Sequence, residues 1–169
     1  RCFDQGSLTI DDKRRNKTYL ENRLRESSKE KIINRDDWLK ELNTIIEIGT
    51  LTQDNLQRVS QLFNKTNQFN LTTKRYSEND ISLFMKEQKF FVIAIGLNDK
   101  FGENGIVGLA IIKVEEKMAE IDTLLMSCRI LGRKIEFKFM DIIIDFLKQK
   151  GIKCVFAEYK ETSKNKQVK

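Results

Sequence analysis

The chain has 169 residues, of which 40% are hydrophobic, and this is enough to bury the core of one medium-sized domain with an additional segment. It carries 31 basic and 25 acidic residues, a net charge of +6. Residues 1–43 hold 11 of the basic and 9 of the acidic side chains, so this segment is not a concentrated polycation. Since no basic stripe with interleaved aromatics exists either, we expect no nucleic-acid partner, and we consider phosphate-bearing ligands or acidic carrier proteins instead.

Residue types that the chain lacks exclude further classes of site. It has no histidine, and its three cysteines, Cys2, Cys128 and Cys154, are far apart and form no CxxC pair. Zinc sites, Ser-His-Asp triads and Cys-His dyads are therefore excluded within these residues, and we expect no metal. The sequence has no 18-residue apolar run and no signal-peptide pattern, so we expect a cytoplasmic protein without a membrane partner.

The first 43 residues predict a helical arm. Thr9 begins a capping-box pattern and a polar helix that runs to about Ser28, and Asn34 begins a second helix. The apolar residues of the first helix form only a thin stripe, Tyr19, Leu20 and Leu24, and those of the second are Trp38, Leu39 and Leu42. The chain begins at Arg1 and ends in a lysine-rich stretch, so we expect it to be a piece of a longer protein.

From Thr44 the hydrophobic period changes. Residues 44–48 form a β-branched run that predicts a short strand. Thr52 and Ser77 then stand at N-cap positions and predict two helices. Their apolar faces are Leu56, Val59, Leu62 and Phe63 in the first helix, and Ile81, Phe84 and Met85 in the second.

The second half predicts three strands, a helix and a last strand. Residues 90–97 and 106–114 are apolar runs joined by a loop with Asn104-Gly105, which is typical of an antiparallel hairpin. A third strand follows at 120–127, a largely apolar helix at about 133–150, and a strand at 153–159. Simple alternation in the third strand points Ile121, Thr123 and Leu125 to one face, and Glu120, Asp122 and Leu124 to the other.

The turn between that strand and the helix predicts a phosphate site. Residues 128–133 lead directly into a helix, whose first N–H groups lack intrahelical partners and whose dipole favours negative charge. The alternative is that Gly132 only allows the chain to turn sharply from strand to helix.

Three residues near this turn are candidates for chemistry. Glu120 and Asp122 share a face of the strand and are candidate general bases, although solvated carboxylates give the same pattern. Cys128 lies beside a helix N-terminus, which would stabilise a thiolate that receives an acyl group. The alternative for Cys128 is an ordinary buried cysteine.

A polar loop between the two middle helices is a candidate substrate-binding segment. Amides and hydroxyls there would line the acyl-acceptor side of a cleft, and Arg75 or Tyr76 would meet a phosphate. The alternative is a loop whose amides satisfy its own backbone. The candidate residues are Asn67, Gln68, Asn70, Thr72, Thr73 and Arg75.

The order of elements resembles the fold of the GCN5-related N-acetyltransferases (GNAT), and three motifs resemble the C-terminal half of FkbH-like proteins. The motifs are NQFNLTTKRY at 67–76, FGENG at 101–105 and EIDTLLMSCRILGR at 120–133, and residues 3–14 resemble the segment that precedes this half. The spacing Arg129-x-x-Gly132 matches the front of the R/Q-x-x-G-x-G/A pyrophosphate loop of that superfamily. Lys134 stands where the loop has a second small residue.

The resemblance implies an α+β, GNAT-like acyltransferase domain at 44–169, with a mostly antiparallel sheet flanked by helices and without the usual C-terminal elements. It implies a haloacid-dehalogenase-type (HAD) domain before residues 1–43, and an acyl carrier protein as partner. Acyl-coenzyme A or carrier-bound phosphopantetheine would be the cofactor, for transfer of a glyceryl-type acyl group in polyketide or related biosynthesis. The alternative is a non-catalytic module that docks the carrier protein for the HAD domain. The expected cofactor-binding residues are Ser127, Arg129, Leu131, Gly132, Arg133 and Lys134.

Overall fold

The structure, a computed structural model, describes residues 10–49 and 51–166. The predicted N-cap Thr9, the motif residues before it and Cys2 lie outside this part. The described residues divide into two compact units, one formed by residues up to 45 together with 98–104, the other by 46–97 and 105 onward. No helix in the described part is long and apolar enough to cross a membrane.

Every predicted element is present, with ends shifted by a few residues. The helices are α1 (Ile10–Lys31), α2 (Arg35–Glu41), α3 (Gln53–Lys65), α4 (Glu78–Lys86) and α5 (Ile135–Gln149), with a short 3₁₀ helix η1 (Cys128–Ile130). The strands are β1 (Ile45–Gly49), β2 (Phe90–Asp99), β3 (Gly102–Glu115), β4 (Met118–Met126) and β5 (Cys154–Ala157). Two of the predicted caps form side-chain hydrogen bonds: Asn34 Oδ1 accepts from the Asp36 amide at 2.9 Å, and Ser77 Oγ accepts from the Asp80 amide at 3.2 Å.

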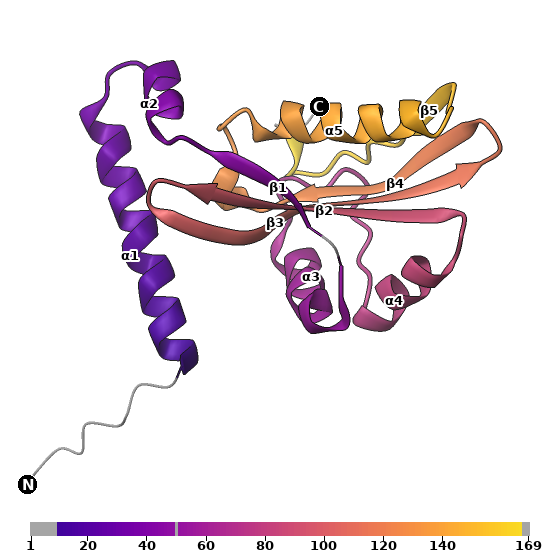
Figure 1. The fold of residues 1–169 in the computed structure, drawn as a ribbon, viewed down its shortest axis with the longest axis horizontal. Coiled ribbons are helices and arrows are strands. Elements are labelled where there is room, and N and C mark those ends of the chain that lie inside the picture. Colours follow the sequence, from indigo (N-terminus) through magenta and orange to yellow (C-terminus); the bar gives the residue numbers. More distant parts are fainter. Residues whose placement is uncertain (1–9, 50, 167–169) are drawn as a thin grey trace, which may run out of the picture. The chain divides into compact units, whose positions relative to one another are not determined.

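The five strands form one mostly antiparallel sheet in the order β1-β2-β3-β4-β5. β4 runs antiparallel to β3 and parallel to β5, which it pairs only from Met118–Cys154 to Ile121–Ala157. The helix α5 covers one face of the sheet, and α3 and α4 cover the other (Figure 1). The second half of β4 therefore extends past the end of its pairing with β5.

The central strands are buried on both faces, which explains their nearly continuous apolar sequence. Alternate residues of β2 belong to different clusters: Ile93, Ile95 and Leu97 pack with Phe139 of α5, whereas Ala94 packs with the cluster of α3 and α4. The two-sided core is built by these period-2 patterns against the apolar faces of the helices.

A bulge in β4 overturns the simple alternation that the sequence suggested for this strand. Ile111 of β3 faces Thr123, but the next residue, Ile112, faces Ile121, so Asp122 is an extra residue in β4. In consequence Ile121 packs in the α5-side cluster, whereas Leu125 packs on the side of α3 and α4. Alternation in the sequence predicts a common face for Ile121 and Leu125, because the bulge depends on the register with the partner strand β3.

The predicted Asn104-Gly105 turn is also wrong. The hairpin turns at Lys100–Phe101, and Gly105 lies inside β3 with φ of 62°. Asp99 Oδ1 accepts from the Phe101 amide at 3.0 Å, and this local bond fixes the tighter turn. Asn104 instead is a buried strand residue.

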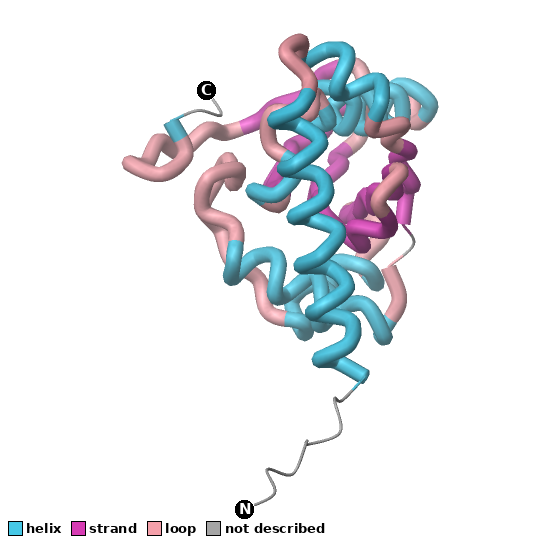
Figure 2. The backbone as a smooth tube through the Cα atoms, turned by 90° about the vertical axis from the view of Figure 1, so that its left-hand side faces the viewer, coloured by secondary structure: helices cyan, strands magenta, loops and turns pink. Residues whose placement is uncertain are grey.

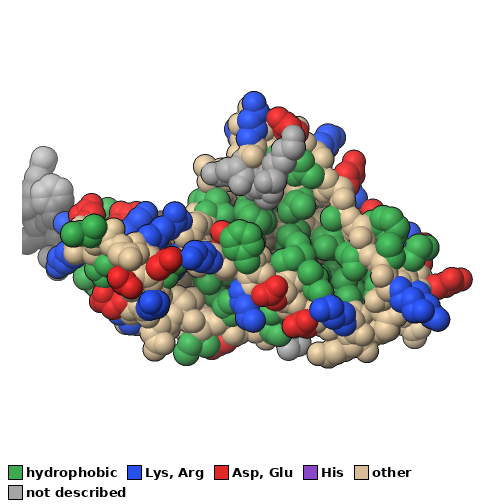
Figure 3. All heavy atoms as spheres, turned by 90° about the horizontal axis from the view of Figure 1, so that it is seen from above, with side chains coloured by type: hydrophobic (Ala, Val, Ile, Leu, Met, Phe, Trp, Pro, Cys, Tyr) green, Lys and Arg blue, Asp and Glu red, His purple; other side chains and the backbone are tan. Residues whose placement is uncertain are grey.

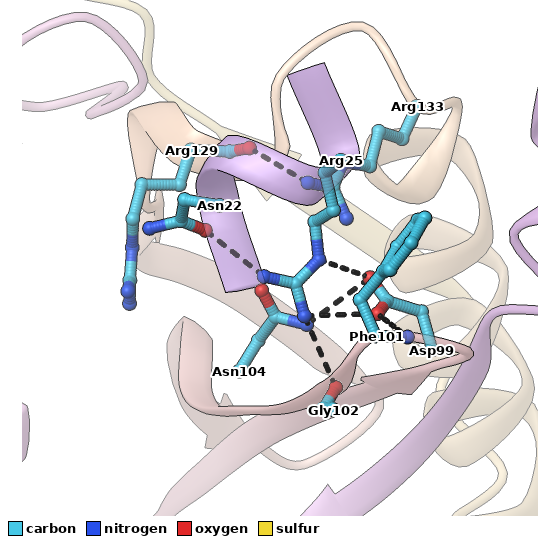
Figure 4. Close-up of polar contacts among 8 residues, drawn as sticks. All are labelled: Asn22, Arg25, Asp99, Phe101, Gly102, Asn104, Arg129 and Arg133. Atoms are coloured by element: carbon cyan, nitrogen blue, oxygen red, sulfur yellow. Dashed lines mark hydrogen bonds and ion pairs between the residues drawn. The ribbon is translucent and has the colours of Figure 1, made fainter. Parts of the chain in front are cut away.

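In the first unit, a buried ion pair joins α1 to the hairpin end. Arg25 donates from Nε and Nη2 to the two carboxylate oxygens of Asp99 at 2.7 and 2.8 Å, from Nη2 to the Gly102 carbonyl, and from Nη1 to Asn22 (Figure 4). The side chains of Arg25 and Asp99 are 3% and 0% exposed. The thin apolar stripe of α1 is exposed, so this helix buries a charged residue in place of its apolar ones.

Candidate functional site

The predicted catalytic residue Asp122 lies at the centre of a hydrogen-bonded cluster. Its Oδ1 accepts from Lys74 Nζ at 2.6 Å, and its Oδ2 accepts from the Tyr76 hydroxyl at 2.9 Å and from Thr123 Oγ1 at 3.0 Å. The Asp122 carbonyl accepts from Thr72 Oγ1 at 3.0 Å. The structure thus brings a predicted catalytic residue against the predicted substrate-binding loop.

The electrostatics of this cluster favour a positioning role for Asp122. Burial, and next the hydrogen bond to Asp122, raise the pKa of Tyr76 well above the usual value of a tyrosine, so Tyr76 remains a donor. Three of the roughly four acceptor positions of this carboxylate are occupied by the protein itself, so about one is left for a substrate. Lys74 was not among the residues predicted from the sequence, although it lies between two predicted substrate-binding residues, Thr73 and Arg75.

Glu120, the other predicted base, lies on the exposed part of β4. It faces Lys113 of β3 and Phe156 of β5. Because the bulge at Asp122 shifts the phase of the strand, the alternation from which we predicted a common face for Glu120 and Asp122 does not apply here. The catalytic role of Glu120 stays a prediction.

Residues 69–71 pair with β4 at the point where β5 no longer does. The Met126 amide donates to the Phe69 carbonyl at 3.0 Å, and the Leu71 amide donates to the Leu124 carbonyl at 3.2 Å. Between these bonds Asn70 forms an antiparallel bridge with Leu125. The backbone groups of β4 are therefore bonded, at these positions, to the protein's own loop.

The amides inside the loop bond largely within it, as in the alternative interpretation. Asn70 Oδ1 accepts from the Thr73 amide at 3.0 Å, and its Nδ2 donates to the Lys74 carbonyl at 3.2 Å. Asn67 Oδ1 accepts from Arg75 Nη2 at 2.5 Å. These bonds fix the loop conformation, including Thr73, which has a left-handed φ of 59°.

Four predicted substrate-binding residues nevertheless line a polar cavity of about 240 Å³. Gln68 is exposed and Thr72 is buried against Asp122, and neither lines this cavity. Two cationic side chains, Arg75 and Lys164, stand there among amides and hydroxyls, a set that suits a polar or anionic ligand. The lining residues are Thr66, Asn67, Asn70, Thr73, Arg75 and Thr162–Lys164.

The segment after β5 closes one side of this cavity. Residues 158–166 run mainly as loop (Figure 2), and Asn165 is fully buried. Asn165 Nδ2 donates to the carbonyls of Asn70 and Lys160 at 3.0 and 2.9 Å, and the Lys160 amide donates to the Leu71 carbonyl at 2.8 Å. The C-terminal segment is thereby attached to the polar loop, a contact across 95 residues that no local sequence pattern predicts.

The turn after β4 uses several of its own amides. The amides of Ile130, Leu131 and Arg133 donate to the carbonyls three residues earlier, at 3.2, 3.3 and 3.3 Å. The Ser127 amide donates to the Val107 carbonyl at 2.7 Å, and Arg133 Nη2 donates to the Arg129 carbonyl at 3.3 Å (Figure 4). Three amides of the predicted phosphate loop are thus bonded within η1 and the turn that follows it.

The start of α5 differs from a typical phosphate-binding helix start. The helix begins at Ile135, and Gly132 and Lys134 have left-handed φ values of 77° and 62°. A lysine side chain has no acceptor, so Lys134 cannot cap the first N–H groups. In the first turn, Glu136 Oε2 is buried and has no hydrogen-bond partner within the described residues. Glu136 places a negative charge where the helix dipole favours one.

A second cavity, of about 280 Å³, opens between α3 and the end of β4. It brings together Ser127, Cys128 and Arg129, which were predicted for different roles, and Ser127 Oγ accepts from Arg129 Nε at 3.3 Å. The basic α3 residues Arg58 and Lys65 were not predicted as site residues, because basic residues on a helix are usually solvated surface charges. The lining residues are Arg58, Leu62, Lys65, Thr66, Ser127, Cys128 and Arg129.

The two described cysteines are free thiols. Cys128 and Cys154 are both exposed, so the interpretation of Cys128 as an ordinary buried cysteine does not hold. Among the residues that the structure describes, no group of three or more Cys, Asp or Glu residues could hold a metal ion.

A third, largely apolar groove of about 910 Å³ borders β1, β2, α4 and α5, and none of the predicted site residues lines it. Figure 3, which looks onto the side of the molecule that carries α5, shows apolar side chains gathered on that side. The predicted chemistry lies elsewhere, along β4.

Comparisons with known proteins identify the fold. No protein-family model matches the sequence, and no curated protein matches it. Solved structures match. The ribosomal-protein-S18-alanine N-acetyltransferase of Escherichia coli has a TM-score of 0.54 and 13% identity over 70% of each chain. A GNAT family acetyltransferase of Staphylococcus aureus has a TM-score of 0.52 and 12% identity, over 70% of this chain and 87% of that one.

A ribosomal-protein-alanine N-acetyltransferase of Brucella melitensis is similar to the same degree, with a TM-score of 0.51 and 14% identity over 70% of this chain and 83% of that one. At these identities the likeness establishes the fold. The mixed sheet, α5 on one face and α3 and α4 on the other agree with it. The predicted fold class is confirmed: the chain has the GNAT acetyltransferase fold.

Proposed function

We propose that this protein binds a phosphopantetheine thioester, on coenzyme A or on an acyl carrier protein, and takes part in acyl transfer. One observation carries the proposal. In a sheet of the GNAT acetyltransferase type, the parallel pair β4–β5 separates after Ile121 and Ala157, and residues 69–71 pair with β4 beyond that point, next to a polar cavity and a basic one. A thioester held at this point would have its acyl group near the polar loop and its phosphate near the turn after β4.

The proposed acyl acceptor binds in the polar cavity of residues 66–75 and 162–164. Glu120, which is exposed on β4, would accept the proton of the acceptor, and Asp122 would hold the loop through Lys74 and Tyr76. Cys128, exposed at the end of β4, remains the candidate for a covalent acyl intermediate.

The finer assignment rests on the sequence motifs. The resemblance to FkbH-like proteins supports an acyl carrier protein as partner, a HAD domain in the same polypeptide and a glyceryl-type acyl group. The motif at 67–76 is the polar loop, and the motif at 120–133 is β4 with its turn, so both motifs lie at the candidate site.

A second candidate function, non-catalytic docking of the carrier protein, is favoured by a specific observation. Residues 69–71 already bond to β4 at Leu124 and Met126, and the carboxylate of Asp122 already accepts three hydrogen bonds. Such a site would retain a surface for a carrier protein, while Asp122 and this part of β4 are engaged by the protein itself.

Calorimetric titration with coenzyme A, with a phosphopantetheinylated carrier protein and with the same carrier lacking the group tests the proposal. We expect binding of the first two and not of the third. Release of coenzyme A from glyceryl-coenzyme A, with the glyceryl group gained on the thiol of the phosphopantetheinylated carrier protein, would then show transfer, which Glu120→Gln removes and the matched β3 variant Glu115→Gln keeps. Equal binding of both carrier forms without this transfer would establish docking, and absence of all binding would refute both functions.

A further inference from the structure

The basic cavity of about 280 Å³ is built by one face of α3 and the end of β4. Arg58, Leu62 and Lys65 follow each other at intervals of four and three residues, so they share one face of the helix. This face meets Ser127–Arg129. The cavity therefore has two cations from α3 and one from η1.

The two cations that α3 contributes to this cavity have no partner for their charge within the described residues. No carboxylate is among the residues that line it, and within the described residues neither Arg58 nor Lys65 forms a side-chain hydrogen bond or ion pair. Lys65 lies in the last turn of α3, where the helix dipole favours a cation. That dipole acts only within the last turn, so it does not account for Arg58, which lies seven residues before the end of the helix.

A concave site lined by three cations concentrates anions, because its low-dielectric walls focus the field. The hydroxyls of Ser127 and Thr66, both buried, add short polar groups that can orient an oxyanion. Arginine and lysine around hydroxyl groups form the donor set that recognises a phosphoryl group. The backbone amides of the turn after β4 cannot supply these donors alone, because the amides of Ile130, Leu131 and Arg133 already donate to carbonyls of the same turn.

We propose that the cavity lined by Arg58, Lys65, Arg129 and Ser127 is a phosphoryl-binding site, in which side chains of α3 replace backbone amides as the main donors. Its identification with the phosphate of phosphopantetheine rests on the proposed function. The cavity itself does not, because any phosphate or pyrophosphate group satisfies the same donors.

Cys128 provides a direct test, because its exposed thiol lies on the wall of this cavity while Cys154, also exposed, lies on β5. Alkylation by anionic iodoacetate and neutral iodoacetamide is followed at each cysteine by peptide mass spectrometry. We expect the iodoacetate-to-iodoacetamide rate ratio to be about tenfold higher at Cys128 than at Cys154. The iodoacetate-to-iodoacetamide rate ratios of Cys128 and Cys154 should become nearly equal in about 1 M salt, where the Debye length is about 3 Å. Inorganic pyrophosphate should protect Cys128 from iodoacetamide.

The variants Arg58→Gln and Lys65→Gln should each weaken pyrophosphate protection by about tenfold. Lys86→Gln on α4 is the matched control and should have no effect. Circular dichroism confirms that the variants fold. If Arg58→Gln does not fold, the milder Arg58→Lys variant replaces it.

The outcomes separate the site from the function. Pyrophosphate protection without binding of coenzyme A or of the phosphopantetheinylated carrier protein supports the site and refutes the proposed function. If Arg58→Gln and Lys65→Gln leave both coenzyme A binding and pyrophosphate protection unchanged, the function is supported and the site is overturned. A rate ratio at Cys128 equal to that at Cys154, with no protection by pyrophosphate, overturns the site as well.

Discussion

The Tyr76 hydroxyl donates to Asp122 Oδ2 at 2.9 Å, and this bond ties the polar loop to β4 at its bulge. The Tyr76 ring meets Phe63 and Phe84 edge-on, with centroid distances of 5.6 and 4.9 Å. Aromatic contacts thus hold the ring while the hydroxyl holds the carboxylate. The loop and the strand therefore form one structural unit.

Removing only the hydroxyl tests this relationship. Tyr76→Phe keeps the ring contacts and loses a hydrogen bond to a carboxylate, so it should lower the free energy of unfolding by about 2 kcal/mol. Urea denaturation measures the change. Tyr19→Phe, at an exposed position of α1, is the control and should leave stability unaltered. Equal stability of Tyr76→Phe and the parent protein would contradict the bond.

Stability of the first unit should fall in acid because of Asp99. Burial alone would raise the pKa of Asp99, but hydrogen bonds from Arg25 and the Phe101 amide, with the charge of Arg25, hold that pKa below the usual value. A depressed folded-state pKa gives stability that is present above the unfolded-state value of about 3.9 and is lost as the pH falls through the folded-state value.

Hydrogen exchange of the Lys100 amide, which donates to the Leu42 carbonyl at 3.0 Å, reports on this unit. Its protection should decrease as the pH falls below about 4, once intrinsic exchange is corrected for. Asp99→Asn should remove that dependence. Arg25→Ala leaves a buried carboxylate without its partner and should cost about 3–5 kcal/mol at neutral pH. Protection that is independent of pH in the parent protein would rule this account out.

The attachment of the C-terminal segment predicts a third result. Asn165→Ala removes the donor to the carbonyls of Asn70 and Lys160 and should lower the free energy of unfolding by about 1–3 kcal/mol. The Lys160 amide, which donates to the Leu71 carbonyl within this attachment, should exchange faster. Ser163→Ala, at an exposed position of the same segment, should change neither quantity. Unchanged exchange in Asn165→Ala would show that the segment is held by other contacts.

Local patterns predicted the elements of this fold because each element carries its own signal. The cap residues Asn34 and Ser77 and the apolar face of α5 specify structure within one or two turns. The mostly antiparallel sheet flanked by helices followed from those elements and the resemblance. The predicted position of the β2–β3 turn was wrong. The hydrogen bond from the Phe101 amide to Asp99 favours a turn at Lys100–Phe101 and outweighs the Asn104-Gly105 signal.

The candidate site was harder to predict, since its decisive contacts join distant residues. The bulge at Asp122 depends on the register with β3, and the bond of Asn165 to Asn70 spans 95 residues. Arg58 and Lys65 look like surface cations until the end of β4 is placed against α3. Periodicity in a single sequence carries none of this information.

Replacing Lys134 or Lys138 by glycine should change the free energy of unfolding in opposite directions. Its left-handed φ of 62° is unfavourable for a residue with a side chain, so Lys134→Gly should raise the free energy of unfolding by about 1 kcal/mol. Lys138→Gly, in the interior of α5, should lower it by about 1 kcal/mol. Thermal unfolding of both variants measures the difference, and a loss of stability in Lys134→Gly would contradict the strain at this position.

The central claim is that the separated ends of β4 and β5 receive a phosphopantetheine thioester. Calorimetric titration of the unaltered protein with a carrier protein, with and without its phosphopantetheine group, measures this most directly. The claim predicts saturable one-to-one binding that depends on the phosphopantetheine group and is reproduced by coenzyme A. Equal affinity for the two carrier forms, or no heat with any ligand, would contradict it.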